Sequence, residues 1–193
     1  SDAQSGHMSI AELESLRDGN LTAMMRSLKA RGAAVGKILK DHEETIEPEV
    51  PDLMAPMVTL DRQVPVDWVD GNGHMNESRY VQAMSEASDR FLLWIGCTPD
   101  YIATRGSWFT VENNVRYLAE VMIGDRITAT TQVLEAKGKK LRLHYRIECN
   151  GKLAATVEQL LIHVSMATRR AETPPEEMSA LTQAIAEAHA GHG

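Results

Sequence analysis

Apolar and polar residues alternate most regularly between Lys140 and Cys149, where every second side chain is apolar and those between are charged or histidine. A period of two predicts a strand with one buried face and one face in water. Similar segments lie on both sides of it, and Asn150-Gly151 predicts a tight hairpin to the segment that follows. The four predicted strands cover residues 107–118, 126–136, 140–149 and 152–164.

One long amphipathic segment precedes these strands. From Glu77 to Ile95 apolar residues recur at helical spacing, with Asn76 suited to the N-cap and Gly96 to the C-terminal stop. Small residues such as Ala87 keep part of this predicted helix narrow. A narrow apolar helix favours close wrapping by a sheet.

A further strand is predicted over residues 58–68, before the helix. The order is therefore one strand, one long helix and four strands. A single helix buries its apolar stripe only if the antiparallel sheet curls around it. We predict an α+β fold in which a curled antiparallel sheet of about five strands surrounds one central helix.

The predicted sheet and helix occupy residues 58–167, and other regions flank them. Residues 9–41 show helical spacing without any strand, so these helices cannot close a core alone. Residues 42–57 are acidic and then rich in proline, which predicts a linker, and residues 168–193 form a polar tail with one helix. The opening residues 1–8 look like a cloning scar.

Charge and composition narrow the possible functions. Twenty basic and twenty-seven acidic residues give a net charge of −7, with no basic stripe, which argues against nucleic acid as a partner. No apolar run approaches the roughly 18 residues that span a bilayer. Cys97 and Cys149 show neither metal-ligand spacing nor a small disulfide scaffold, so no metal is predicted and a reducing, cytoplasmic setting is favoured.

The candidate chemistry lies in the Gly-rich turn Asp70-Gly-Asn-Gly-His, directly before the predicted helix. Unpaired backbone N–H groups at a helix N-terminus stabilise developing negative charge, and a carboxylate can serve as base or nucleophile. Together they suit acyl transfer. The same turn is equally explained if Asp70 only shapes a loop and the N–H groups are only capped.

At this turn the chain resembles the hotdog-fold thioesterases of the 4-hydroxybenzoyl-CoA type. The matching residues are Asp70, Gly73, His74, Met75 and Asn76. Two longer runs, residues 64–80 and 107–118, look like the betainyl-CoA thioesterases of bacterial carnitine degradation, a domain also found fused to L-carnitine dehydrogenase. Residues 9–41 are similar to the tail of that dehydrogenase, and no G-x-G-x-x-G motif is present.

The resemblance implies an acyl-CoA thioesterase that converts betainyl-CoA to glycine betaine and CoA, without a cofactor because CoA is part of the substrate. Asp70 would act as general base or as nucleophile, and N–H groups near residues 76–80 would hold the oxyanion. The family also implies a homodimer in which the carboxylate and the helix end come from different subunits. A tetramer of paired dimers and a dehydrogenase partner or fusion are further expectations.

Specificity for a betainyl group requires a site for its quaternary ammonium, which aromatic faces and a nearby carboxylate can hold. Glu112 is expected to share a strand face with Trp108, Thr110 and Asn114, which makes Glu112 the candidate counter-charge or second catalytic carboxylate. His74 and Asn76 are the other catalytic candidates. The candidate substrate contacts are Trp68, Gly73, Met75, Tyr80, Tyr101, Trp108 and Phe109.

Other hypotheses stay open. The aromatic residues can instead fill a core or a dimer interface. The domain can be a non-catalytic module that binds an acyl-CoA or tethers a dehydrogenase, a thioesterase for another short or aromatic acyl-CoA, or a dehydratase. The intact Asp-x-x-Gly turn argues against a pure binding module, because binding alone does not need the carboxylate.

Overall fold

The structure, a computed structural model, describes residues 50–192. The predicted N-terminal helices of residues 9–41, the opening residues 1–8 and the first half of the predicted linker, residues 42–49, lie outside the described residues. Five antiparallel strands form one sheet in the spatial order β1-β3-β4-β5-β2. Their bounds are Met57–Gln63 for β1, Gly106–Tyr117 for β2, Arg126–Lys137 for β3, Lys140–Cys149 for β4 and Lys152–Ser165 for β5.

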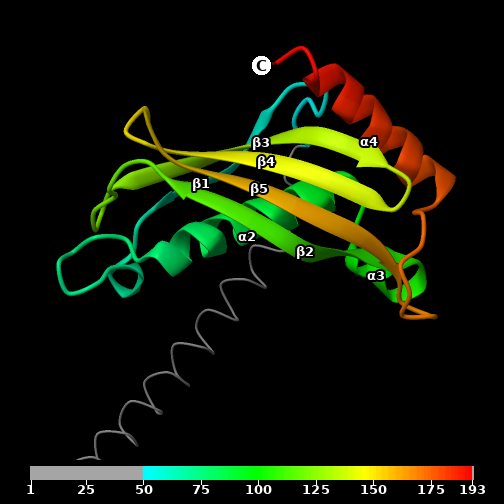
Figure 1. Ribbon diagram of the computed structural model, residues 1–193, viewed down its shortest axis with the longest axis horizontal. Helices are drawn as coiled ribbons and strands as arrows, with labels where there is room; N and C mark the ends of the chain where they lie inside the picture. Colours follow the sequence, from blue (N-terminus) through cyan, green and yellow to red (C-terminus); the bar gives the residue numbers. More distant parts are fainter. Residues whose placement is uncertain (1–49, 193) are drawn as a thin grey trace, which may run out of the picture. The chain divides into compact units, whose positions relative to one another are not determined.

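The sheet curves over one long helix, α2 (Glu77–Trp94), as Figure 1 shows. This arrangement confirms the predicted α+β fold with a single central helix. Ala83 and Ala87 are fully buried, and their small side chains let the helix backbone approach the sheet closely. Phe91, also fully buried, fills the space between the two layers.

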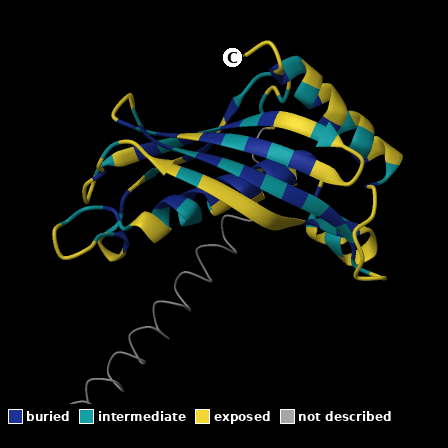
Figure 2. Cartoon of the chain, in the orientation of Figure 1, coloured by how far each residue is buried: buried dark blue, intermediate teal, exposed yellow. Residues whose placement is uncertain are grey.

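The inner face of the sheet supplies the rest of the core. Leu141, Leu143 and Tyr145 are fully buried and alternate with more exposed neighbours, a pattern visible along the strands in Figure 2. The buried Tyr145 hydroxyl donates to Oε1 of Gln159 at 2.7 Å, and Nε2 of Gln159 donates to Oγ1 of Thr110 at 2.8 Å. The polar groups brought inside by β4 and β5 are therefore hydrogen-bonded.

Two local predictions differ from the structure. The strand predicted over residues 58–68 ends at Gln63, because Pro65 has no N–H for the ladder and the chain turns into a short 3₁₀ helix, η1 (Val66–Trp68). A second helix, α3 (Pro99–Thr104), was not predicted. Thr98 caps it by accepting the Tyr101 N–H, and the proline at its first position was the available signal.

The C-terminal helix, α4 (Glu176–His189), covers an open edge of the sheet. β1 pairs with β3 only as far as Thr131, so the N–H of Val133 has no strand partner on that side. His189 accepts it at Nδ1 over 2.9 Å, while its Nε2 lies 3.0 Å from the carbonyl of Leu53. The buried side chain of Ile185 joins the core, so one face of this polar tail belongs to the domain.

None of the helices in the described part of the chain is long and apolar enough to cross a membrane.

The contacts of His189 predict a loss of stability in mild acid. Burial is the main cause that lowers the pKa of His189, opposed by Asp52 and the Leu53 carbonyl and reinforced by His192. Above the unfolded pKa of about 6.5 both states are neutral. As the pH falls below that value the unfolded chain takes a proton first, so the free energy of unfolding decreases. Protonation at Nδ1 also removes the acceptor for the Val133 N–H.

We therefore expect the thermal midpoint to fall between pH 7.5 and pH 5.5, and to fall less in His189→Gln, which keeps a donor and an acceptor but does not titrate. Calorimetry of both proteins at several pH values checks this. Equal pH dependence in the two proteins would show that His189 does not contribute.

Candidate active site

Asp70 lies in the exposed turn between η1 and α2. Its Oδ1 accepts the N–H of Asn72 at 2.8 Å and that of His74 at 3.1 Å, while its own N–H donates to the His74 carbonyl at 2.9 Å. Gly73 has φ +79°, a left-handed conformation that favours glycine. Asp70 therefore shapes the loop, and its Oδ2 has no partner among the described residues.

The N-terminus of α2 follows directly. Asn76 is the N-cap, as predicted: its Oδ1 accepts the Ser78 N–H at 3.0 Å, and its carbonyl accepts the Arg79 N–H at 2.9 Å. The Asn76 N–H itself donates to the carbonyl of Trp68. This leaves the N–H of Glu77 without an acceptor among the described residues. It is a backbone donor at the positive end of the helix dipole.

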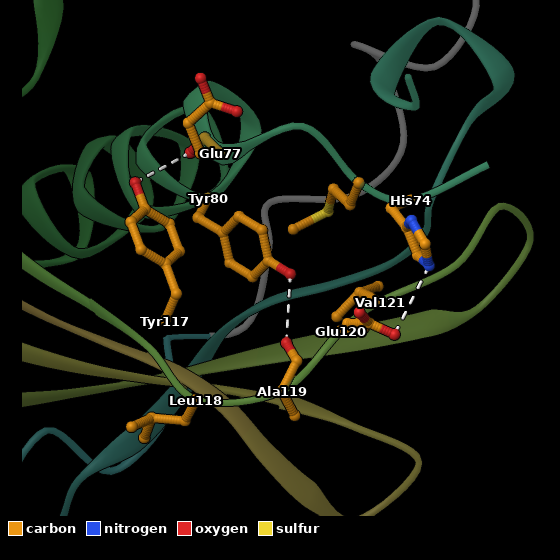
Figure 3. A pocket seen from close by; sticks show the side chains of 9 residues that line it. His74, Glu77, Tyr80, Tyr117, Leu118, Ala119, Glu120 and Val121 are labelled. Atoms are coloured by element: carbon orange, nitrogen blue, oxygen red, sulfur yellow. Dashed lines mark hydrogen bonds and ion pairs between the residues drawn. The ribbon is translucent and has the colours of Figure 1, made fainter. Parts of the chain in front are cut away.

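A cleft of about 410 Å³ opens beside this turn (Figure 3). The turn and α2 form one side, and the end of β2 with the following loop forms the other. The loop is tied to the turn, because the Met75 N–H donates to the Val121 carbonyl at 2.7 Å. The lining residues are His74, Met75, Glu77, Tyr80, Tyr117, Leu118, Ala119, Glu120 and Val121.

Side-chain contacts hold this lining in place. The rings of Tyr80 and Tyr117 meet edge to face, with centroids 5.2 Å apart. The Tyr117 hydroxyl donates to the Glu77 carbonyl at 3.2 Å, and the Tyr80 hydroxyl to a loop carbonyl at 3.4 Å. Burial raises the pKa of Tyr80, so its phenol stays neutral near pH 7. Nε2 of His74 lies 3.5 Å from Oε2 of Glu120.

Several predicted site residues meet here. His74, Met75 and Tyr80 line the cleft, and Gly73 forms the turn beside it. Trp68 is also near the turn but is buried, and the guanidinium of Arg62 lies 4.3 Å above the ring centroid. That cation already occupies one face of Trp68.

The other predicted aromatic contacts lie elsewhere in the chain. Trp108 packs against His163 near the start of β2, and the Tyr101 hydroxyl is 2.8 Å from Nε2 of the same histidine. Trp108 is nine residues before Tyr117 in β2, roughly 30 Å along a strand. Phe109 is 42% exposed. Within one chain these side chains do not join the cleft.

The prediction that Glu112 shares a strand face with Trp108, Thr110 and Asn114 is wrong in part. β2 has an irregular register between Thr110 and Glu112, where one extra residue faces β5. Thr110 pairs with the buried Leu161, whereas Glu112 pairs with the next residue, Leu160, on the opposite face. A bulge of one residue reverses the side-chain alternation. Glu112 therefore shares a face with Asn114 but not with Trp108 and Thr110.

Tyr117 and Glu120 are among the cleft residues that sequence reasoning missed. Tyr117 stands at the end of a predicted strand, and Glu120 belongs to the loop after it. No local pattern singles them out. They reach the site through the pairing of their loop with the turn, which includes the bridge between His74 and Met122.

Relatives of this chain include curated proteins of known name. A Ruegeria pomeroyi protein named L-carnitine dehydrogenase/betainyl-CoA thioesterase is 48% identical over 197 residues, 99% of this chain and 40% of its own length. The betainyl-CoA thioesterase of Pseudomonas aeruginosa is 34% identical over 136 residues, 69% of this chain and 86% of that protein. This chain thus spans about 40% of the fused relative that it matches.

Solved structures share the fold. A Staphylococcus aureus protein determined in complex with CoA is 26% identical, with a TM-score of 0.64, and the match covers 70% of this chain and 86% of that protein. Residues 64–181 match the thioesterase-like superfamily, more than half of the sequence. This chain therefore belongs to the thioesterase-like superfamily and adopts its hotdog fold.

Proposed function

We propose that this protein is an acyl-CoA thioesterase that hydrolyses betainyl-CoA to glycine betaine and CoA. One observation carries the proposal: within residues 50–192, a carboxylate oriented by two backbone N–H groups has one oxygen without a partner, beside a cleft and a helix end whose first N–H has no acceptor. The names of the Ruegeria and Pseudomonas relatives support the acyl group, and the CoA complex of the Staphylococcus protein supports an acyl-CoA ligand.

In the general-base route, Oδ2 of Asp70 takes a proton from water as the water oxygen bonds to the thioester carbon. The carbonyl oxygen becomes an oxyanion, and the Glu77 N–H stabilises it. In this proposal the carboxylate and the donor come from one chain, and not from two subunits as the resemblance implies. Collapse breaks the C–S bond, and the CoA thiolate leaves and takes the proton from Asp70. In the alternative route Asp70 attacks the carbon itself, and water hydrolyses the resulting mixed anhydride.

His74 connects the turn to the cleft. Its backbone N–H orients Asp70, while its ring lies in the cleft lining next to Glu120. This placement suits a side chain that positions the thioester beside the carboxylate. Asn76 contributes by holding the start of α2, since its side chain caps the helix.

A homodimer through β2 completes the proposal. Among the described strands β2 pairs only with β5, and its free edge is long and carries exposed apolar side chains, including Phe109 and Val111. Such an edge readily pairs with another chain. A two-fold axis at the middle of β2 would bring the Trp108 end of one chain to the Tyr117 end of the other. Glu112 would then lie near the axis, so its role as counter-charge depends on the second chain.

We also propose a dehydrogenase partner or fusion and a cytoplasmic location for this protein. The match to the Ruegeria fusion covers 99% of this chain, which supports a dehydrogenase partner or fusion for the region before the described residues. Both described cysteines, Cys97 and Cys149, are buried free thiols, which supports a reducing, cytoplasmic setting.

The variant Asp70→Asn tests the proposed catalytic role of Asp70 separately from its role in shaping the loop. Asparagine keeps the Oδ1 acceptor for the two N–H groups but loses the negative charge and the base. We expect kcat/KM for betainyl-CoA to fall by roughly 10²–10⁴ with an unchanged thermal midpoint, measured by thiol release. Asp67→Asn, an exposed acid in the preceding helix η1, serves as the control and should retain activity. Full activity of Asp70→Asn would overturn the mechanism.

Glu77→Pro tests the oxyanion donor. Proline suits the first position of a helix and lacks the N–H, and Asn76 already has the extended backbone that precedes proline, with ψ 144°. We expect kcat to fall about 10²–10³-fold while the protein stays folded by circular dichroism. Glu77→Ala keeps the N–H and should lose much less. Equal loss in both variants would assign the effect to the side chain.

Val111→Lys tests the β2 interface. Val111 is 57% exposed on β2, and Val58 is 54% exposed on β1 at the opposite edge of the sheet. Because the two introduced lysines would both lie close to the proposed axis, where the strands meet, we expect Val111→Lys to reduce the mass in sedimentation equilibrium from two chains to one. Val58→Lys should remain a dimer. A wild-type protein that sediments as one chain would contradict the interface.

A further inference from the structure

The cleft beside Asp70 has the composition of a site for a cation. Its nine described lining residues include two carboxylates, Glu77 and Glu120, two tyrosine rings and one histidine, and none of them is lysine or arginine. A cleft with this lining attracts a cationic acyl group and repels an anionic one.

The two aromatic rings are fixed and one of them is accessible. Tyr117 is 51% exposed, whereas Tyr80 behind it is 4% exposed. Each hydroxyl already donates to a backbone carbonyl, so the rings offer their faces rather than their O–H groups. A quaternary ammonium has no N–H to donate, and it is attracted by aromatic faces.

Glu120 supplies the negative charge at the cleft opening. Its side chain is 80% exposed and turns toward His74, whereas the Glu77 carboxylate points away from the two rings (Figure 3). Among the described residues, Nε2 of His74 at 3.5 Å is the only basic nitrogen within 4 Å of the Glu120 carboxylate. Its carboxylate is thus open to a ligand.

The cleft also lies at the right place for a short acyl group. In a betainyl thioester one CH₂ separates the quaternary nitrogen from the carbonyl carbon, so the cation site must adjoin the catalytic carboxylate. His74 lies between the two sites, since its backbone N–H donates to Oδ1 of Asp70 and Nε2 of its ring faces Oε2 of Glu120. We infer that Tyr117 and Glu120, with Tyr80 behind them, bind the trimethylammonium group. This subsite rests on the proposed hydrolysis of betainyl-CoA.

The test compares betainyl-CoA with 3,3-dimethylbutyryl-CoA, which replaces the quaternary nitrogen by carbon and keeps the shape. The readout is the ratio of kcat/KM for the two substrates. We expect the wild-type protein to prefer betainyl-CoA, and Glu120→Gln and Tyr117→Leu each to reduce the ratio about three- to tenfold. Glu187→Gln, an exposed acid on α4, makes the same change in net charge and should leave the ratio unchanged.

The outcomes separate the two proposals. Hydrolysis of betainyl-CoA with an unchanged ratio in both cleft variants would overturn the subsite and leave the thioesterase intact. Failure to hydrolyse either substrate would overturn the proposed function. In that case titration with tetramethylammonium, followed by NMR of the tyrosine rings, tests the subsite alone. Chemical-shift changes at Tyr117 that become smaller in Glu120→Gln would support the subsite. The absence of such changes would refute it.

Discussion

The apolar stripe of α2 has one surface to pack against, the concave face of the sheet, and the position of the site depends on that packing. The small side chains of Ala83 and Ala87 allow the close approach, and Phe91 fills the remaining space. Once the helix is seated, its N-terminus is fixed relative to the strands. The turn that carries Asp70 is therefore held by the core and not by its own few hydrogen bonds alone.

The site itself is built from two distant parts of the sequence. The turn and the start of α2 supply the Asp70 carboxylate and the Glu77 N–H, and the end of β2 with its loop supplies the opposite side of the cleft. A backbone hydrogen bond from the Met75 N–H to the Val121 carbonyl joins the two parts. In the proposed function, chemistry and acyl binding thus come from different segments, which lets one vary while the other is kept.

The sequence predicted the regular elements well, because the period of β4 and the apolar spacing of α2 are local signals. It predicted the Asn76 cap and the turn at Asp70 for the same reason. It failed where one residue changes the geometry: Pro65 ends β1 early, and the extra residue before Glu112 reverses the faces of β2. Tyr117 and Glu120 could not be found, since only tertiary pairing brings them to the turn.

The carboxylate of Asp70 uses one oxygen for the fold, and the other has no partner in the described part of the chain. Asparagine preserves the first oxygen, and the codons of the two amino acids differ by a single base. Under the proposed mechanism, this protein is therefore one point mutation from a protein that would still fold and still hold its acyl-CoA without hydrolysing it. Gene duplication followed by that change would give a carrier or sensor of the same ligand. Before a relative is called an enzyme, the residue at the position of Asp70 should therefore be checked, and not only the overall sequence similarity.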